Sequence, residues 1–361
     1  MNPLQILQGH NGVDLFGLPA DELSEFLEDI GVGSQHTKRV FRSLHGTFLN
    51  LAKDPQFGQR NAARINAMGT RASVEHVRTQ AAPDGSSKLL FRLGDQALVE
   101  GVLIPGQRGR TTLCLSSQVG CGVGCSFCAT GTMGLTRNLL AGEMMAQVHH
   151  AMKALALVDK RLSHVVFMGM GEPLQNYERI RRVIRILMDT RGPCLESRRI
   201  TVSTVGIPRM MKRFGKDFNG RVQLALSLHA GTDQTRKRII PLARTHPLAA
   251  LREVLVQHPL PGSRHIMIEY VVLPGVNDSD TELKAVSEWT HDLRCIVNLV
   301  PFNPFSGSGF RSPTVAEVES VMTRLKTLGV RVSVRWPRGR EIHGACGQLA
   351  LTGQRLHPLP M

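Results

Sequence analysis

The sequence predicts an α/β fold in which a partial or full α/β barrel follows a small helical domain. From about residue 111 onward, short β-prone apolar segments alternate with helical segments, a pattern typical of a parallel sheet with right-handed crossovers. Before about residue 75, apolar residues recur at helical spacing instead. The 361 residues leave room for about two domains.

Residues 1–80 are expected to form the helical accessory domain. Asp21 and Glu22 suit a first helical turn, and Leu23 and Phe26 begin one apolar face. A second helix is expected over residues 36–49. Basic side chains are frequent here: Lys38, Arg39, Arg42, Arg60, Arg64, Arg71 and Arg78. They are either a solvated surface or a contact surface for a polyanion.

Residues 81–105 are expected to form a β-hairpin linker that carries Glu100. Segments 88–92 and 97–104 are strand-like, and the Gly-Asp pair between them suits a tight turn. The barrel should then occupy residues 106–351, followed by a short C-terminal tail over residues 352–361.

Seven barrel strands are expected, over residues 111–116, 163–168, 199–203, 221–227, 266–272, 296–300 and 330–334. Six helices should lie between them, over residues 141–156, 178–189, 208–214, 247–257, 280–291 and 314–328. The active site of a parallel barrel gathers at the carboxyl ends of its strands. Such ends carry or are followed by Glu172, Ser203, Ser227, His229 and Asn303, which makes these residues candidate site residues.

Cys121, Cys125 and Cys128 form a C-x3-C-x2-C motif after the first barrel strand. Three thiolates on one tight loop can hold three irons of a cubane iron–sulfur cluster and leave the fourth iron open. A structural zinc site normally uses two pairs of ligands, and the sequence has no second pair at that spacing. We therefore interpret the three cysteines as ligands of a [4Fe–4S] cluster.

The composition narrows the class of protein further. The net charge is +15 and the isoelectric point is about 10.1, which favours a polyanionic partner, although a basic protein without one is the alternative.

Seven cysteines, three of them clustered, do not suggest a secreted disulfide framework. We find no signal peptide and no apolar run of ~20 residues, so we expect a cytoplasmic protein with no membrane contact.

Two further stretches accompany the cysteine motif: Cys114-Leu-Ser-Ser-Gln-Val-Gly-Cys121 before the last two cysteines, and Ala345-Cys346-Gly-Gln-Leu near the C-terminus. The motif resembles that of radical S-adenosyl-L-methionine (SAM) enzymes. With both stretches, the chain resembles the RlmN/Cfr family of radical-SAM RNA adenosine methyltransferases from about residue 88 to residue 351. The resemblance implies a partial (β/α)6 radical-SAM barrel, one [4Fe–4S] cluster held by three cysteines and SAM, and a helical domain that contacts RNA.

The resemblance also implies roles for individual residues. SAM contacts are expected from Gly171, Glu172, Ser203, Ser227, Leu228, His229 and Asn303. Cys346 would carry the methyl group, Cys114 would be its resolving partner, and Glu100 would accept a proton. Without the family motifs, His229 would be read as a structural histidine and Glu100 as an exposed strand carboxylate. We interpret Cys194 and Cys295 as small buried hydrophobes.

The implied reaction explains the need for two cysteines. Carbons 2 and 8 of adenine are poor nucleophiles, so a thiolate takes the methyl group first. Cleavage of a second SAM gives a 5′-deoxyadenosyl radical, which removes a hydrogen from the methyl group on Cys346, and the methylene radical adds to adenine. After the ring proton is lost, the Cys114 thiolate attacks the Cys346 sulfur, which releases methylated RNA and leaves a disulfide.

We expect carbon 2 of an adenosine in 23S ribosomal RNA as the target, with transfer RNA left open as a second substrate. An electron donor such as flavodoxin would reduce the cluster, and the protein would be a monomer. One alternative is methylation of carbon 8 of the ribosomal adenine, the antibiotic-resistance type, because Cys128-Ala-Thr-Gly131 resembles that branch. An alternative of another class is a non-catalytic iron–sulfur RNA-binding protein, which the set of Cys114, Cys346 and Glu100 argues against.

Overall fold

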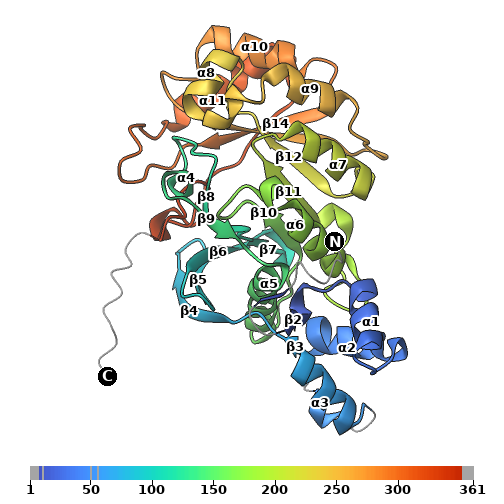
Figure 1. Ribbon diagram of the computed structural model, residues 1–361. Helices are drawn as coiled ribbons and strands as arrows, with labels where there is room; N and C mark the ends of the chain where they lie inside the picture. Colours follow the sequence, from blue (N-terminus) through green and yellow to red (C-terminus); the bar gives the residue numbers. More distant parts are fainter. Residues whose placement is uncertain (1–7, 10–11, 49–50, 55–56, 352–361) are drawn as a thin grey trace.

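The computed structural model describes residues 8–9, 12–48, 51–54 and 57–351 (Figure 1). The expected tail over residues 352–361 therefore lies outside the described residues. A ten-stranded sheet runs through the described chain, and most of its strands belong to the barrel.

Seven parallel strands form the barrel part of this sheet and neighbour one another in chain order. They are β7 (Thr111–Cys114), β10 (His164–Phe167), β11 (Ile200–Thr204), β12 (Gln223–Ser227), β13 (Ile266–Val272), β14 (Cys295–Pro301) and β15 (Val332–Val334). All seven coincide with predicted strands to within about two residues at each end. This sequential order of parallel strands is the one found in α/β barrels.

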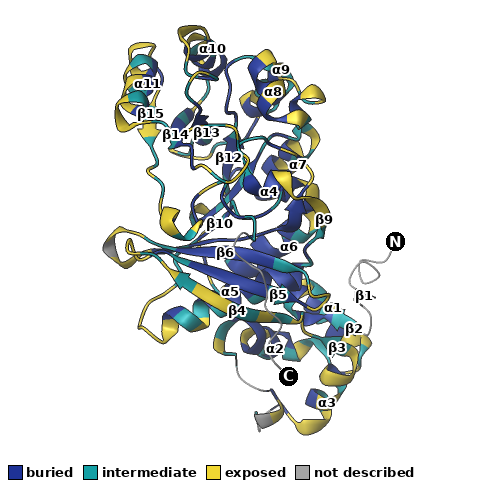
Figure 2. Cartoon of the chain, turned by 90° about the vertical axis from the view of Figure 1, so that its left-hand side faces the viewer, coloured by how far each residue is buried: buried dark blue, intermediate teal, exposed yellow. Residues whose placement is uncertain are grey.

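Helices connect these strands and cover the outside of the sheet (Figure 1). They are α5 (Ala141–Ala156), α6 (Tyr177–Met188), α7 (Pro208–Phe218), α8 (Asp233–Ile239), α9 (Leu248–Val256), α10 (Asp280–Thr290) and α11 (Val315–Thr327). Their inner faces and the strands form the buried core, whereas the outer helix faces are exposed (Figure 2). The described chain therefore has the predicted partial (β/α)6 arrangement, with α8 as a short helix that the sequence pattern did not predict.

Three antiparallel strands extend the barrel sheet beyond β7. They are β4 (Val74–Ala81), β5 (Ser87–Leu93) and β6 (Leu98–Pro105). The predicted hairpin corresponds to β5 and β6. Most side chains of β4 are polar, and this strand was not predicted. In the register of β6 and β7, Val102 pairs with Cys114. The hairpin that carries Glu100 therefore lies directly beside the strand that carries Cys114.

The N-terminal helices are α1 (Ala20–Asp29), α2 (Thr37–Arg42) and α3 (Gln59–Met68), accompanied by the short strands β1 (Gln8–Gly9), β2 (Gly12–Asp14) and β3 (Gly69–Thr70). Helix α1 buries Leu23 and Phe26, as the spacing predicted. The second helix is shorter than predicted, because a π-helical turn over Ser43–Thr47 follows it and Phe48 has a positive φ of 54°.

Polar contacts join this helical region to the barrel. Arg182 of α6 pairs with Glu22 of α1 at 2.8 Å. The buried rings of His45 and His149 share a hydrogen bond of 3.0 Å between Nδ1 and Nε2. None of the helices in the described ranges is long and apolar enough to cross a membrane.

Candidate active site

The three cysteines of the motif lie on a hairpin loop between β8 (Gln118–Cys121) and β9 (Gly134–Asn138), with the short helix α4 (Ala129–Thr132) inside it. The loop folds on itself, because the Cys128 N–H donates to the Cys125 carbonyl at 3.2 Å. It is also tied to α8, where the Ile239 carbonyl accepts the Ser126 N–H at 3.0 Å. Neither β8 nor β9 was predicted.

Gly120 makes this hairpin possible. Its φ is +74°, and a Cβ at this position would overlap the carbonyl oxygen of Gly134 on the facing strand. Only glycine adopts this conformation readily and allows so close an approach. The glycine before Cys121 therefore has a defined role in shaping the loop.

The donor set fits an iron–sulfur cluster. Burial raises the pKa of Cys121 to about 12 and raises the pKa of Cys125 and Cys128, so a bound cation is needed to hold these groups as thiolates. Among the described residues, no three His, Cys, Asp or Glu side chains are placed to hold one metal ion. A cubane cluster has a different requirement, because each thiolate binds its own iron.

A cavity of about 170 Å³ brings the cysteines together with most of the predicted SAM residues. Its lining includes Cys121, Cys125, Cys128, Gly171, Glu172, Ser203, Ser227, His229 and Asn303. We call it the cluster cavity. Leu228 is placed differently: its side chain is fully buried and its N–H donates to the Glu269 carbonyl at 3.0 Å. The carboxyl ends of several parallel strands, β10, β11, β12 and β14 among them, thus meet the cysteine loop, as the barrel geometry predicts.

Glu172 is a buried carboxylate at the wall of this cavity. Its oxygens accept the N–H groups of Leu174 at 3.0 Å and Val205 at 2.9 Å. Burial nevertheless raises its pKa. A cationic partner in the cavity would therefore stabilise the charged form of Glu172.

His229 is held neutral with its proton at a defined nitrogen. Its Nδ1 accepts the Val271 N–H at 2.9 Å, which places the ring proton on Nε2. Burial lowers its pKa to about 3, with a further contribution from Arg236. The ring also packs edge-on against Phe127, with 4.7 Å between centroids. His229 can therefore donate a hydrogen bond but carries no charge near neutral pH.

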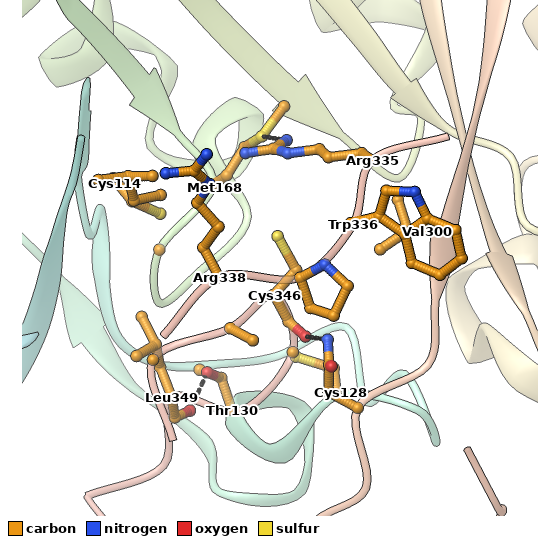
Figure 3. Close-up of a pocket in the computed structure, with 17 residues that line it drawn as sticks. Cys114, Cys128, Thr130, Met168, Val300, Arg335, Trp336, Arg338, Cys346 and Leu349 are labelled. Atoms are coloured by element: carbon orange, nitrogen blue, oxygen red, sulfur yellow. Dashed lines mark hydrogen bonds between the residues drawn. The ribbon is translucent and has the colours of Figure 1, made fainter. Parts of the chain in front are cut away.

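A second cavity of about 200 Å³ contains Cys114 and Cys346, and we call it the cysteine-pair cavity (Figure 3). Cys114 lies buried at the end of β7, whereas Cys346 is exposed, and both thiols are free. Burial raises the pKa of Cys114 to about 12, and the nearby Cys346 adds to this effect while Arg335 opposes it. The two cavities share part of their lining, including Cys128, Asn303, Arg335 and Cys346.

Backbone contacts fix the loop that carries Cys346. Asn303 donates from Nδ2 to the Cys346 carbonyl at 3.3 Å. The Ala129 N–H in α4 donates to the Gly347 carbonyl at 2.7 Å. The last described residues accordingly lie beside the cysteine hairpin in Figure 1. Helix α4 and the Cys346 loop, which are more than 200 residues apart in the sequence, thus lie in contact.

Glu100 lies close to this region but lines neither cavity. It is fully buried, not an exposed strand carboxylate, and its Oε1 pairs with Lys88 Nζ at 3.0 Å. Its Oε2 accepts the Leu351 N–H at 3.3 Å. The C-terminal segment therefore covers Glu100.

Two residues of the site were missed by the sequence reasoning. Arg236 of α8 is buried and donates from Nε to the Leu228 carbonyl at 3.0 Å. Met168 lines both cavities. Neither residue belongs to a sequence motif or a periodic pattern that would have indicated a place in the site. Cys194, predicted to be buried, is exposed in a turn with a φ of 54°, whereas Cys295 is buried as predicted.

The fold and the cysteine hairpin define a protein of the radical SAM class, and residues 115–284 match the model of the radical SAM superfamily. The chain is similar to proteins named dual-specificity RNA methyltransferase RlmN. That of Syntrophobacter fumaroxidans is 38% identical over 345 residues, which cover 92% of this chain and 96% of the relative. That of Geobacter sulfurreducens is 40% identical over 344 residues, which cover 93% and 92%.

A crystal structure of a radical SAM methyltransferase from Sphaerobacter thermophilus matches with a TM-score of 0.84 and 38% identity. The match covers 93% of this chain and 98% of that one. The chain belongs to the RlmN family of dual-specificity RNA methyltransferases.

Proposed function

We propose that this protein methylates carbon 2 of an adenosine in 23S ribosomal RNA, with transfer RNA as a second substrate, through a methyl group carried on Cys346. The relatives' name, dual-specificity RNA methyltransferase, supports an RNA substrate. The observation that carries the proposal is the position of Cys346, which lines both the cluster cavity and the cysteine-pair cavity. One thiol can thus face a methyl donor and a methyl acceptor.

Cys121, Cys125 and Cys128 would hold one [4Fe–4S] cluster, and SAM would occupy the cluster cavity. When bound, the cluster supplies the electron for reductive cleavage of SAM. The buried Glu172 carboxylate suits the cationic amine of SAM, and the Nε2–H of His229 offers a hydrogen bond without a repelling charge. Ser203 and Ser227, with hydroxyl oxygens 3.4 Å apart, add further polar contacts.

Cys114 would resolve a protein–RNA adduct on Cys346, and the position of both thiols at one cavity supports this role. Glu100 would take the proton lost from adenine, and its Oε1 pairs with the buried Lys88 Nζ at 3.0 Å. Because Leu351 covers Glu100, this role requires the C-terminal segment to move when RNA binds.

Helices α1 to α3 and the loop over residues 335–340 would contact RNA phosphates, consistent with the net charge of +15. Some predicted basic residues already have protein partners: Arg39 pairs with Asp54 at 3.0 Å, and Arg64 donates to the Gly31 carbonyl. We further propose a cytoplasmic monomer that receives electrons from a flavodoxin-like donor. Free exposed thiols such as Cys346 persist in a reducing compartment.

Mass spectrometry of RNA tests the proposal. Ribosomal and transfer RNA from cells lacking the gene should gain a methyl group on adenine carbon 2 when the wild-type gene is restored. The Cys346→Ala gene should restore none, although its protein should still bind iron. A methyl group on carbon 8 would select the resistance-type alternative. Wild-type complementation that leaves adenine unmethylated in both RNA classes would contradict the proposal.

A further inference from the structure

Trp336 stands out by its exposure. The chain has 13 Phe, 2 Tyr and 2 Trp, and Trp336, at 47% exposure, is the one such aromatic residue among the strongly exposed hydrophobic side chains of the described ranges. The other tryptophan, Trp289, is 8% exposed. The other aromatic side chains of the described ranges are buried or partly buried, whereas this indole is accessible to solvent.

The position of the indole is equally specific. Trp336 lines the cysteine-pair cavity together with Cys346, as Figure 3 shows. It follows β15 directly, in a segment whose backbone is anchored where the Arg335 N–H donates to the Leu299 carbonyl at 2.8 Å. The ring therefore lies at the rim of the cavity that contains the proposed methyl carrier.

Positive charge flanks the indole on both sides along the chain. Arg335 donates to the sulfur of Met168 at 3.3 Å. Arg338 is exposed and donates to the Pro105 carbonyl at 2.8 Å. Both hydrogen bonds are to uncharged acceptors, so neither bond neutralises the positive charge of its guanidinium. Two carboxylates lie nearby, Glu269 beside Arg335 and Asp84 beside Arg338.

We propose that Trp336 is a stacking platform for an unpaired nucleobase of the substrate RNA at the rim of the cysteine-pair cavity. An accessible aromatic ring can stack on an unpaired base, and arginines near it in the chain can contact the phosphates of the same RNA. An enzyme that modifies a ring carbon must remove the target base from its stack, and aromatic contacts offset part of that cost. The inference rests on the proposed function, since it assumes an RNA substrate, and it adds the residue that receives a base.

The test measures RNA binding and does not depend on turnover. The probe is a short RNA stem-loop with unpaired adenosines in its loop, and the control RNA is a fully paired duplex of equal length. Trp336→Leu should bind the stem-loop about tenfold more weakly than wild type, while Trp336→Phe should lose much less because a ring remains. Both variants should bind the duplex as wild type does. Leu157→Ala removes an 88% exposed side chain elsewhere and is the matched control.

Tryptophan fluorescence gives a second readout. In a Trp289→Phe background the emission comes from Trp336 alone, and the stem-loop should quench it more than the duplex does. Equal affinities of Trp336→Leu and wild type, with no quenching, would overturn the inference while leaving the proposed function intact. Failure of the wild-type protein to bind any RNA would overturn both.

Discussion

Replacing Cys114 with Ala should trap RNA on the protein. Cys114 ends β7 with 7% of its surface exposed, so losing its sulfur leaves a small cavity at a cost of about 1 kcal/mol, and the variant should fold. Cys346 remains exposed and can still accept a methyl group and join adenine. Without the second thiol the adduct cannot be resolved, so RNA should stay bonded to Cys346 through a methylene bridge.

The pKa of Cys114 sets the pH dependence of this step in the wild-type protein. Burial raises that pKa to about 12, so at about pH 8 roughly one Cys114 in 10⁴ is a thiolate. Only the thiolate attacks the Cys346 sulfur. Because the pH lies below the pKa, each unit increase in pH should raise the thiolate fraction, and with it the rate of RNA release, about tenfold.

Denaturing gels with labelled RNA, followed by nuclease digestion and peptide mass spectrometry, would detect the trapped adduct. Release from a preformed wild-type adduct can be timed after a jump in pH. Cys346→Ala is the matched control, since it lacks the acceptor and should show no adduct. Normal turnover by Cys114→Ala without trapped RNA would refute the two-cysteine reasoning, and release that does not change with pH would refute the ionisation argument.

Three further predictions concern folding, cluster binding and RNA binding. Burial lowers the pKa of His45 to about 3 from 6.5, so only the unfolded chain binds this proton between those values. The contribution of His45 to the free energy of unfolding should be complete above about pH 6.5 and fall by about 1.4 kcal/mol per pH unit below it, and His45→Gln should remove this part of the pH dependence of thermal unfolding. Gly120→Ala should lower the iron content after reconstitution, because the new Cβ would overlap the carbonyl oxygen of Gly134. The control Gly109→Ala, at a φ of +70° with open space around it, should not lower the iron content, and equal iron in both variants would contradict the prediction. Arg338→Gln should reduce the slope of log affinity for RNA against log salt by about 0.7, and an unchanged slope would exclude its phosphate contact.

The barrel could be predicted because its strands are encoded locally. Ile266–Val272 is apolar at six of its seven positions and β-prone, and the predicted strand has these same ends. The β8–β9 hairpin could not be predicted in the same way. Its strands are short, and its closure depends on the approach of Gly120 to Gly134 across the cysteine loop. A pairing of that kind has no hydrophobic period.

The candidate site, like the fold, could be predicted from the sequence only in part. The cysteine motif and the residues after the barrel strands were found by spacing and by family resemblance, and Glu172 and His229 do line the cluster cavity. The buried state of Glu100 could not be anticipated, because Lys88 comes from the neighbouring strand and Leu351 from the far end of the chain. Contacts across such separations are set by the tertiary fold.

Asn303 links the two halves of the proposed reaction. Family resemblance assigned it to SAM, yet its Nδ2 donates to the Cys346 carbonyl at 3.3 Å and its Oδ1 accepts from Arg340 at 3.1 Å. Each group of this amide keeps a second hydrogen-bonding position, one N–H and one lone pair, so Asn303 can contact SAM while it holds the Cys346 loop. One amide therefore lines the cluster cavity and holds the Cys346 loop, and it can connect the two. In the proposed reaction Cys346 would meet first a methyl donor and then an RNA base, and this connection would let the occupant of one cavity influence where the thiol lies.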